Sequence, residues 1–250
     1  MVSPTELRDL PPPYGTVVFD CDSTLAAIEG IEELARDNAE VARLTRAAME
    51  GSVPLEEVYG RRLALVRPTR ADLERIGARY VETLLPGAAA LVAALQALGK
   101  RVCIVSGGLL PAVAHVARAL ELPAAQVFAV DLCFDAAGRY AGFDAQAPLA
   151  RAGGKVEVLR ALRRPGERLA LVGDGATDLE AAPEAERFVA FGGIVRHARV
   201  LAAARVRVLD PDFRALVPLL LAPEEQARLA ERPEHAALRA PARGPSPPTA

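Results

Sequence analysis

Five short apolar runs, spread along a chain of 250 residues, constrain the fold most. They occupy residues 16–19, 101–105, 168–172, 187–191 and 206–209. Short runs rich in Val, Leu, Ile and Phe are typical of buried strands. Helical patterns with Gly or Pro stops separate the last four runs. This alternation predicts an α/β fold, with an open parallel sheet covered by helices on both faces.

The segment between the first two runs is too long for a single crossover helix. Its amphipathic stretches, near residues 31–50, 54–66 and 69–84, predict a compact helical cap over the strand ends. Alternating apolar and polar residues in 127–143 predict a β-hairpin. The expected units are an N-terminal segment (1–13), a core (14–30 and 85–221), a cap (31–84) and a tail (222–250). The tail is rich in proline and predicted to be largely disordered, with a short helix near residues 224–231.

The first run ends in two aspartates, Asp20 and Asp22, within the segment V-V-F-D-C-D-S-T. If the strand continues through them, residues two apart project to the same side. Two carboxylates in one small volume repel each other, so a shared proton or a bound cation must compensate. Taken alone, the segment is equally consistent with a solvated strand end.

Two further segments could bind phosphate. Ser106-Gly107-Gly108 follows the second run, and a hydroxyl and glycine amides before a helix predict an anion site. Lys155 follows two glycines and opens an amphipathic stretch. It is one of only two lysines in a chain that otherwise uses arginine, and a compact ammonium suits a phosphoryl oxygen.

The segment G-D-G-A-T-D, residues 173–178, follows the third run. Glycines remove bulk around Asp174, whose carboxylate could bind a hard metal, while Asp178 could orient Lys155 or metal-bound water. Each segment alone could be an ordinary glycine-rich turn. Together they follow strands at the edge where open α/β sheets bind ligands.

In this order, the four segments resemble those of the haloacid dehalogenase superfamily of aspartate-nucleophile phosphotransferases. Within it the chain is most similar to the phosphoserine phosphatase family, because further matching segments surround Glu29, Met49 and Arg62. The resemblance covers about residues 17–220. It implies a Rossmann-like core with a small helical cap inserted after the first strand.

The resemblance also implies roles for the site residues. Asp20 is expected to attack phosphorus, and Asp22 to protonate the leaving oxygen and then activate water. Mg²⁺ is expected on Asp20, Asp174 and the backbone carbonyl of Asp22. The other catalytic and phosphate-binding residues are expected to be Ser106, Gly107 and Lys155. Thr177 and Asp178 are expected to support these residues without contacting the phosphate.

In the cap, the resemblance implies that Glu29 binds the substrate ammonium, Arg62 its carboxylate, and Met49 lines the pocket. Without it, Glu29 and Arg62 would be interpreted as part of a solvated helix face. Where relatives often have two glycines after the cap methionine, this chain has Glu50 and Gly51.

The expected activity is Mg²⁺-dependent hydrolysis of O-phospho-L-serine to serine and phosphate, the last step of serine biosynthesis. The alternative is a phosphatase or phosphotransferase of the same superfamily acting on another small phosphomonoester. A carbon–halogen hydrolase would not use a second acid at Asp22. A non-catalytic phospho-receiver domain would usually lack a cap.

Composition indicates which kinds of partner and which cellular location to expect. A net charge of −2 with mixed signs and no basic stripe argues against a nucleic-acid binder, and the apolar runs are too short for a membrane span. Cys21, Cys103 and Cys133 are expected to be buried thiols in a reducing compartment, which indicates the cytoplasm. The histidines are scattered and predict no metal site. The oligomeric state is left open, with a homodimer as the candidate assembly.

Overall fold

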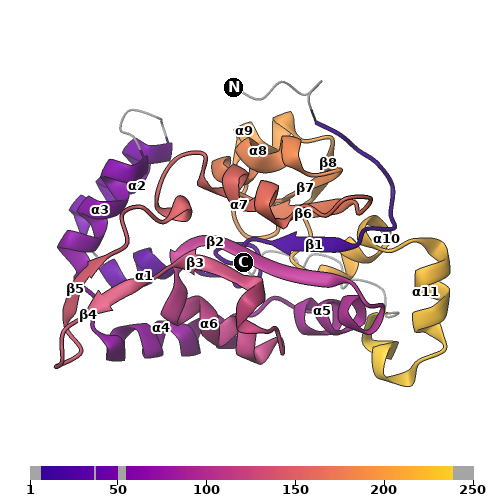
Figure 1. Ribbon diagram of the computed structural model, residues 1–250, viewed down its shortest axis with the longest axis horizontal. Helices are drawn as coiled ribbons and strands as arrows, with labels where there is room; N and C mark the ends of the chain where they lie inside the picture. Colours follow the sequence, from indigo (N-terminus) through magenta and orange to yellow (C-terminus); the bar gives the residue numbers. More distant parts are fainter. Residues whose placement is uncertain (1–6, 37, 50–54, 239–250) are drawn as a thin grey trace, which may run out of the picture.

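The computed structural model describes residues 7–36, 38–49 and 55–238, and its core is a parallel sheet of six strands (Figure 1). The strands lie in the spatial order β3-β2-β1-β6-β7-β8. Their bounds in that order are β3 (Val127–Val130), β2 (Arg101–Leu109), β1 (Thr16–Phe19), β6 (Leu169–Gly173), β7 (Arg187–Phe191) and β8 (Val206–Val208). From β1 the chain continues to β2 on one side, and it later returns to β6 on the other. The carboxyl end of β1 is therefore a topological switch point, where such sheets bind ligands. The predicted α/β fold is confirmed.

Helices cover both faces of this sheet. One face carries α5 (Ala88–Ala97), α6 (Leu110–Ala119) and α10 (Val217–Leu220), and the other α7 (Gly154–Leu162), α8 (Ala176–Ala181) and α9 (Ala198–Ala203). Successive side chains of β1 point to opposite faces of the sheet, so β1 contributes to both helical layers. Val17 and Phe19 pack into the first layer, whereas Val18 packs into the second. A strand buried on both faces is apolar throughout, as the sequence of β1 shows.

The described part of the insertion after β1 contains four helices. They are α1 (Gly30–Ala35), α2 (Ala39–Met49), α3 (Leu55–Val66) and α4 (Arg70–Glu82), so the stretch expected at residues 31–50 is two helices. A capping box starts α4, because Thr69 and Asp72 satisfy each other's backbone N–H groups. Helix α4 then packs along α6 of the core (Figure 1). The last cap helix is therefore anchored on the sheet's helical layer.

The hairpin expected over residues 127–143 is only partly right. Residues 127–130 are β3, an edge strand of the main sheet, in parallel register with β2. The hairpin itself consists of β4 (Leu132–Phe134) and β5 (Tyr140–Phe143). The ring centroid of Phe143 lies 5.4 Å from that of Tyr59 on α3, and the Arg70 guanidinium lies 4.6 Å from the Phe134 ring. The hairpin thus joins the cap to the core edge.

The prediction for the tail is right in its short helix and wrong in expecting the rest of residues 222–238 to be disordered. Helix α11 (Pro223–Ala230) matches the short helix expected there, and a 3₁₀ helix (Pro233–Leu238) follows it. Leu229 is buried in the core, and the Glu225 carboxylate lies 2.5 Å from the buried Lys100 ammonium. Residues 239–250 lie outside the described part. No helix within the described ranges is both long and apolar enough to cross a membrane.

Candidate active site

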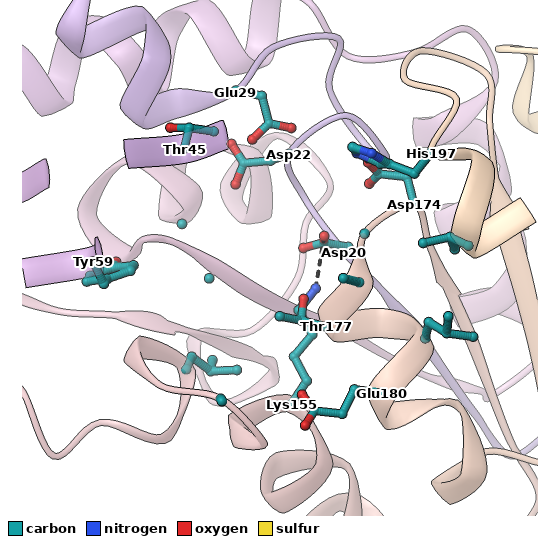
Figure 2. Close-up of a pocket in the computed structure, with 18 of the residues that line it drawn as sticks. Asp20, Asp22, Glu29, Thr45, Tyr59, Lys155, Asp174, Thr177, Glu180 and His197 are labelled. Carbon is teal, nitrogen blue, oxygen red and sulfur yellow. Dashed lines mark ion pairs between the residues drawn. The ribbon is translucent and has the colours of Figure 1, made fainter. Parts of the chain in front are cut away.

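A cavity of about 550 Å³ lies at the carboxyl ends of β1, β2 and β6, below the cap. Most of the predicted site residues line it: Asp20, Asp22, Glu29, Arg62, Gly107, Lys155, Asp174 and Thr177. In Figure 2, Asp22 and Glu29 lie to one side of Asp20, Asp174 lies to the other, and Lys155 approaches from below. Met49 ends α2, but its side chain lies outside the described part of the structure, as does Glu50.

Asp20, Lys155 and Asp178 form a buried chain of charges. The Lys155 Nζ lies 2.9 Å from Asp20 Oδ2 (Figure 2) and 2.6 Å from Asp178 Oδ1. Asp20 Oδ1 accepts the N–H of Cys21 at 2.8 Å. Burial alone would lower the pKa of Lys155, but the charges of Asp178 and Asp20 together outweigh it and raise that pKa. Lys155 is therefore a fixed cation beside the carboxylate of Asp20.

Asp178 can reach Lys155 because residue 173 is glycine. A Cβ at Gly173 would lie 2.3 Å from Asp178 Cγ. The other carboxylate oxygen of Asp178 accepts the Gly175 N–H at 3.0 Å, near the start of α8. The side chain is thus held over the end of β6.

Asp174 completes a group of three carboxylates. Oxygens of Asp20, Asp174 and Asp178 lie within 4.8 Å of one another, and all three residues are buried. Such an oxygen cluster fits a hard cation of the Mg²⁺ type. Asp174 Oδ1 accepts the Thr24 hydroxyl at 2.8 Å. Asp178 is 0% exposed, whereas Asp20 is 8% and Asp174 5% exposed, so Asp20 and Asp174 are the more accessible ligands of the three.

Asp22 lies in a different environment from Asp20. Its Oδ1 accepts the Gly30 N–H at 2.7 Å and the Tyr80 hydroxyl at 2.5 Å, and its Oδ2 accepts the Ser106 hydroxyl at 3.2 Å. Burial, followed by the charge of Asp20, raises the pKa of Asp22 to about 6, against the effect of these hydrogen bonds. A carboxyl group that titrates near neutrality can both donate and accept a proton.

The Ser106 segment lies where β2 ends. Strand β2 runs to Leu109, beyond the expected residue 105. The Ser106 hydroxyl is buried and accepts the Gly108 N–H at 3.0 Å. A Cβ at Gly108 would lie 2.8 Å from Asp22 Oδ2, so glycine is required for this close approach.

Glu29 and Arg62 place a carboxyl group and a guanidinium in the cap part of the cavity. Burial, followed by the charge of Asp22, raises the pKa of Glu29 to about 9, and its Oε1 accepts the Ser23 hydroxyl at 2.6 Å. Arg62 lies against Tyr59, with its guanidinium carbon 5.9 Å from the ring centroid, and its buried Nε has no hydrogen-bond partner among the residues described. Among the residues that the structure describes, neither forms an ion pair with another side chain.

Sequence reasoning missed Tyr80 and His197. Tyr80 follows Leu73 and Ile76 on the buried face of α4, a spacing that only indicates core packing. His197 lines the cavity 3.5 Å from Asp174 Oδ2, and that hydrogen bond is the main cause of its raised pKa. The expectation of buried cysteines is confirmed for Cys21 and Cys103 and wrong for Cys133, which is exposed on the hairpin.

Comparison with known proteins gives the same family as the geometry. The model of the haloacid dehalogenase-like hydrolases matches residues 14–186. The chain is 42% identical to the phosphoserine phosphatase of Homo sapiens over 216 residues, which are 84% of this chain and 96% of that protein. It is 41% identical to that of Mus musculus over 215 residues, with the same coverage of 84% and 96%.

A solved structure described as the phospho-aspartyl intermediate analogue of phosphoserine phosphatase superposes with a TM-score of 0.69 at 25% identity. The superposition covers 84% of this chain and 100% of that one. The chain therefore belongs to the haloacid dehalogenase-like hydrolases and, within them, to the phosphoserine phosphatase family.

Proposed function

We propose that this chain hydrolyses O-phospho-L-serine to L-serine and phosphate. The observation that carries the proposal is the Glu29 carboxyl group and the Arg62 guanidinium, which lie in the same cavity as Asp20 and Lys155. Phosphoserine carries an ammonium, a carboxylate and a phosphate. The Glu29 carboxyl group and the Arg62 guanidinium are half-buried and have no ion-pair partners among the described side chains. They match the first two groups, and the residues around Asp20 match the third.

In the first step, an oxygen of the Asp20 carboxylate attacks phosphorus in line with the seryl oxygen. The bond from phosphorus to the seryl oxygen breaks, and Asp22 donates its proton to that oxygen, which leaves as the serine hydroxyl. Asp20 now carries the phosphoryl group. In the second step, Asp22 takes a proton from water while the water oxygen attacks phosphorus, which releases phosphate and restores Asp20.

The remaining residues hold the phosphoryl oxygens as charge is redistributed. The Lys155 ammonium, the Ser106 hydroxyl and the Gly107 backbone act as donors, Asp178 fixes Lys155, and Thr177 lies at the cavity wall. Mg²⁺ held by Asp20, Asp174 and the backbone carbonyl of Asp22 would reduce the repulsion between the nucleophile and the phosphate dianion.

The cap selects the substrate in this proposal. Glu29 binds the ammonium, Arg62 the carboxylate, and Met49 contributes to the wall. The second candidate is a phosphatase or phosphotransferase of another small phosphomonoester, because the phosphoryl site alone does not distinguish among esters. The proposal includes location in the cytoplasm, no nucleic-acid partner and a homodimeric assembly.

The test compares phosphoserine with p-nitrophenyl phosphate in Arg62→Ala. Removing a charge-assisted contact worth roughly 1.5–3 kcal/mol should lower kcat/KM for phosphoserine about 10- to 150-fold and leave the aryl phosphate little changed. Arg61→Ala is the matched control, since Arg61 is exposed and pairs with Glu57 at 3.1 Å. Equal losses on both substrates would contradict a role in recognition. A wild-type enzyme inactive on phosphoserine but active on other small esters would favour the second candidate.

A further inference from the structure

Tyr80 lies outside the set of residues that the family's motifs identify, yet its hydroxyl contacts the proposed general acid. The side chain is 1% exposed and comes from α4, the cap helix that packs on α6 of the core. Its hydroxyl donates to Asp22 Oδ1 at 2.5 Å. The contact therefore links an anchored cap helix directly to the residue that exchanges protons with the substrate.

The two oxygens of Asp22 are treated differently. Oδ1 accepts two hydrogen bonds, from the Tyr80 hydroxyl and the Gly30 N–H, whereas Oδ2 accepts one longer bond, from the Ser106 hydroxyl at 3.2 Å. The Gly30 N–H can only donate, so Oδ1 must remain an acceptor, whereas the Ser106 hydroxyl can also accept, so the acid proton belongs on Oδ2. Oδ2 also faces the phosphate-binding segment, because it would contact a Cβ at Gly108 at 2.8 Å.

We propose that Tyr80 is a positioning residue for proton transfer: its hydroxyl and the Gly30 N–H occupy Asp22 Oδ1, so that Oδ2 carries the proton delivered to the leaving oxygen. The inference rests on the proposed function, in which Asp22 is the general acid. As the proton leaves Oδ2, negative charge develops on the carboxylate, and the hydrogen bond from Tyr80 strengthens. The contact thus stabilises the transition state more than the bound substrate.

The packing around Tyr80 leaves room for its contact with Asp22. A Cβ at Gly30 would lie 2.2 Å from the Tyr80 hydroxyl oxygen, so residue 30 must be glycine for the hydroxyl to reach Asp22. The same glycine supplies the second donor to Oδ1. Gly30, at the start of the cap, and Tyr80, near its end, therefore hold Asp22 Oδ1 together.

The experiment measures Tyr80→Phe on two leaving groups. The seryl alkoxide needs a proton to leave, whereas p-nitrophenolate leaves without one. Because kcat/KM reports the steps up to departure of the leaving group, we expect it to fall roughly 5- to 20-fold for phosphoserine. For p-nitrophenyl phosphate it should stay within about twofold, and KM for phosphoserine should hardly change.

Tyr14→Phe is the matched control. Tyr14 is also 1% exposed, and its hydroxyl donates to the Leu10 carbonyl at 2.5 Å, away from the cavity. It should leave both substrates unchanged, and the melting temperatures of the two variants show whether either one perturbs the fold. Equal losses on both substrates in Tyr80→Phe, or no loss on phosphoserine, would overturn the inference.

A wrong proposal for the substrate can be told apart from a wrong inference about Tyr80. If the wild-type enzyme does not hydrolyse phosphoserine, the proposed function is contradicted. The same comparison is then made between p-nitrophenyl phosphate and an alkyl phosphate that the enzyme does hydrolyse. Selective loss on the alkyl ester in Tyr80→Phe still supports the role of Tyr80, and an equal loss or no loss still overturns it.

Discussion

Glu29 is a half-buried carboxyl group that forms no ion pair with any side chain in the described part of the chain. Its pKa is raised from 4.5 to about 9, mainly by burial, so the native state binds this proton more tightly than the unfolded state does. Stability therefore falls as the pH rises from about 4.5 towards 9, because the unfolded chain loses the proton first. A site prepared for an ammonium group is thus destabilising while no cation occupies it.

Glu29→Gln should reverse this effect. The amide carries no charge, so the melting temperature of the variant should exceed that of the wild type by more at pH 8 than at pH 5. Activity on phosphoserine should fall in the same variant. Glu33→Gln, on the exposed face of the same helix, is the control and should show no such trend. A difference in melting temperature that does not depend on pH would contradict the raised pKa.

At the level of elements, the short helix α11 is expected from the sequence, but its attachment to the core is not. The composition of the tail, rich in proline, predicts a largely disordered segment, and only Leu229 of the helix is buried. Yet Lys100, which is 8% exposed, donates both to Glu225 and to the Tyr14 carbonyl. An ion pair between distant segments has no signature in local composition, so the sequence could not show that this helix docks.

Glu225→Gln should therefore lower the stability of the whole core. The substitution leaves the buried Lys100 ammonium without its anionic partner, which we expect to cost about 1–3 kcal/mol. The measurement is thermal or urea unfolding. Glu224→Gln, one residue earlier and exposed, is the control. Equal stability of the two variants would show that α11 does not depend on the ion pair.

At the scale of the whole molecule, the sheet brings the catalytic residues together. Asp20 follows β1, Ser106 lies in β2, and Asp174 follows β6, so three neighbouring parallel strands deliver them to one edge. Lys155 arrives from α7. The resulting group of buried carboxylates contains more negative than positive charge, and a divalent cation should stabilise it.

Mg²⁺ should therefore raise the melting temperature of the chelator-treated protein and restore its activity. Ca²⁺ should restore activity poorly, because its larger and looser coordination misplaces the nucleophile. Asp174→Asn should remove most of the thermal shift, whereas Asp144→Asn, in an exposed loop, should leave it intact. Full activity in excess chelator would refute the role of the metal.

The class of fold and most of the candidate site can be derived from the order of the amino acids. Apolar runs identify buried strands because both faces of the sheet exclude water, and the polar residues that follow them lie at the same sheet edge. Asp20, Asp22, Lys155 and Asp174 could be found in this way. Glu29 and Arg62 required the family resemblance, since their local patterns are those of ordinary helix surfaces.

Only the tertiary structure decided which residues surround these groups. Tyr80 and His197 reach Asp22 and Asp174 from elements far away in the chain, and their local sequence indicates no more than core packing or a loop. The assignment of residues 127–130 to the main sheet depends in the same way on pairing with β2. Hydrogen bonds and ion pairs act over a few ångströms of space, whatever the separation along the chain, so they become visible only when the chain is folded.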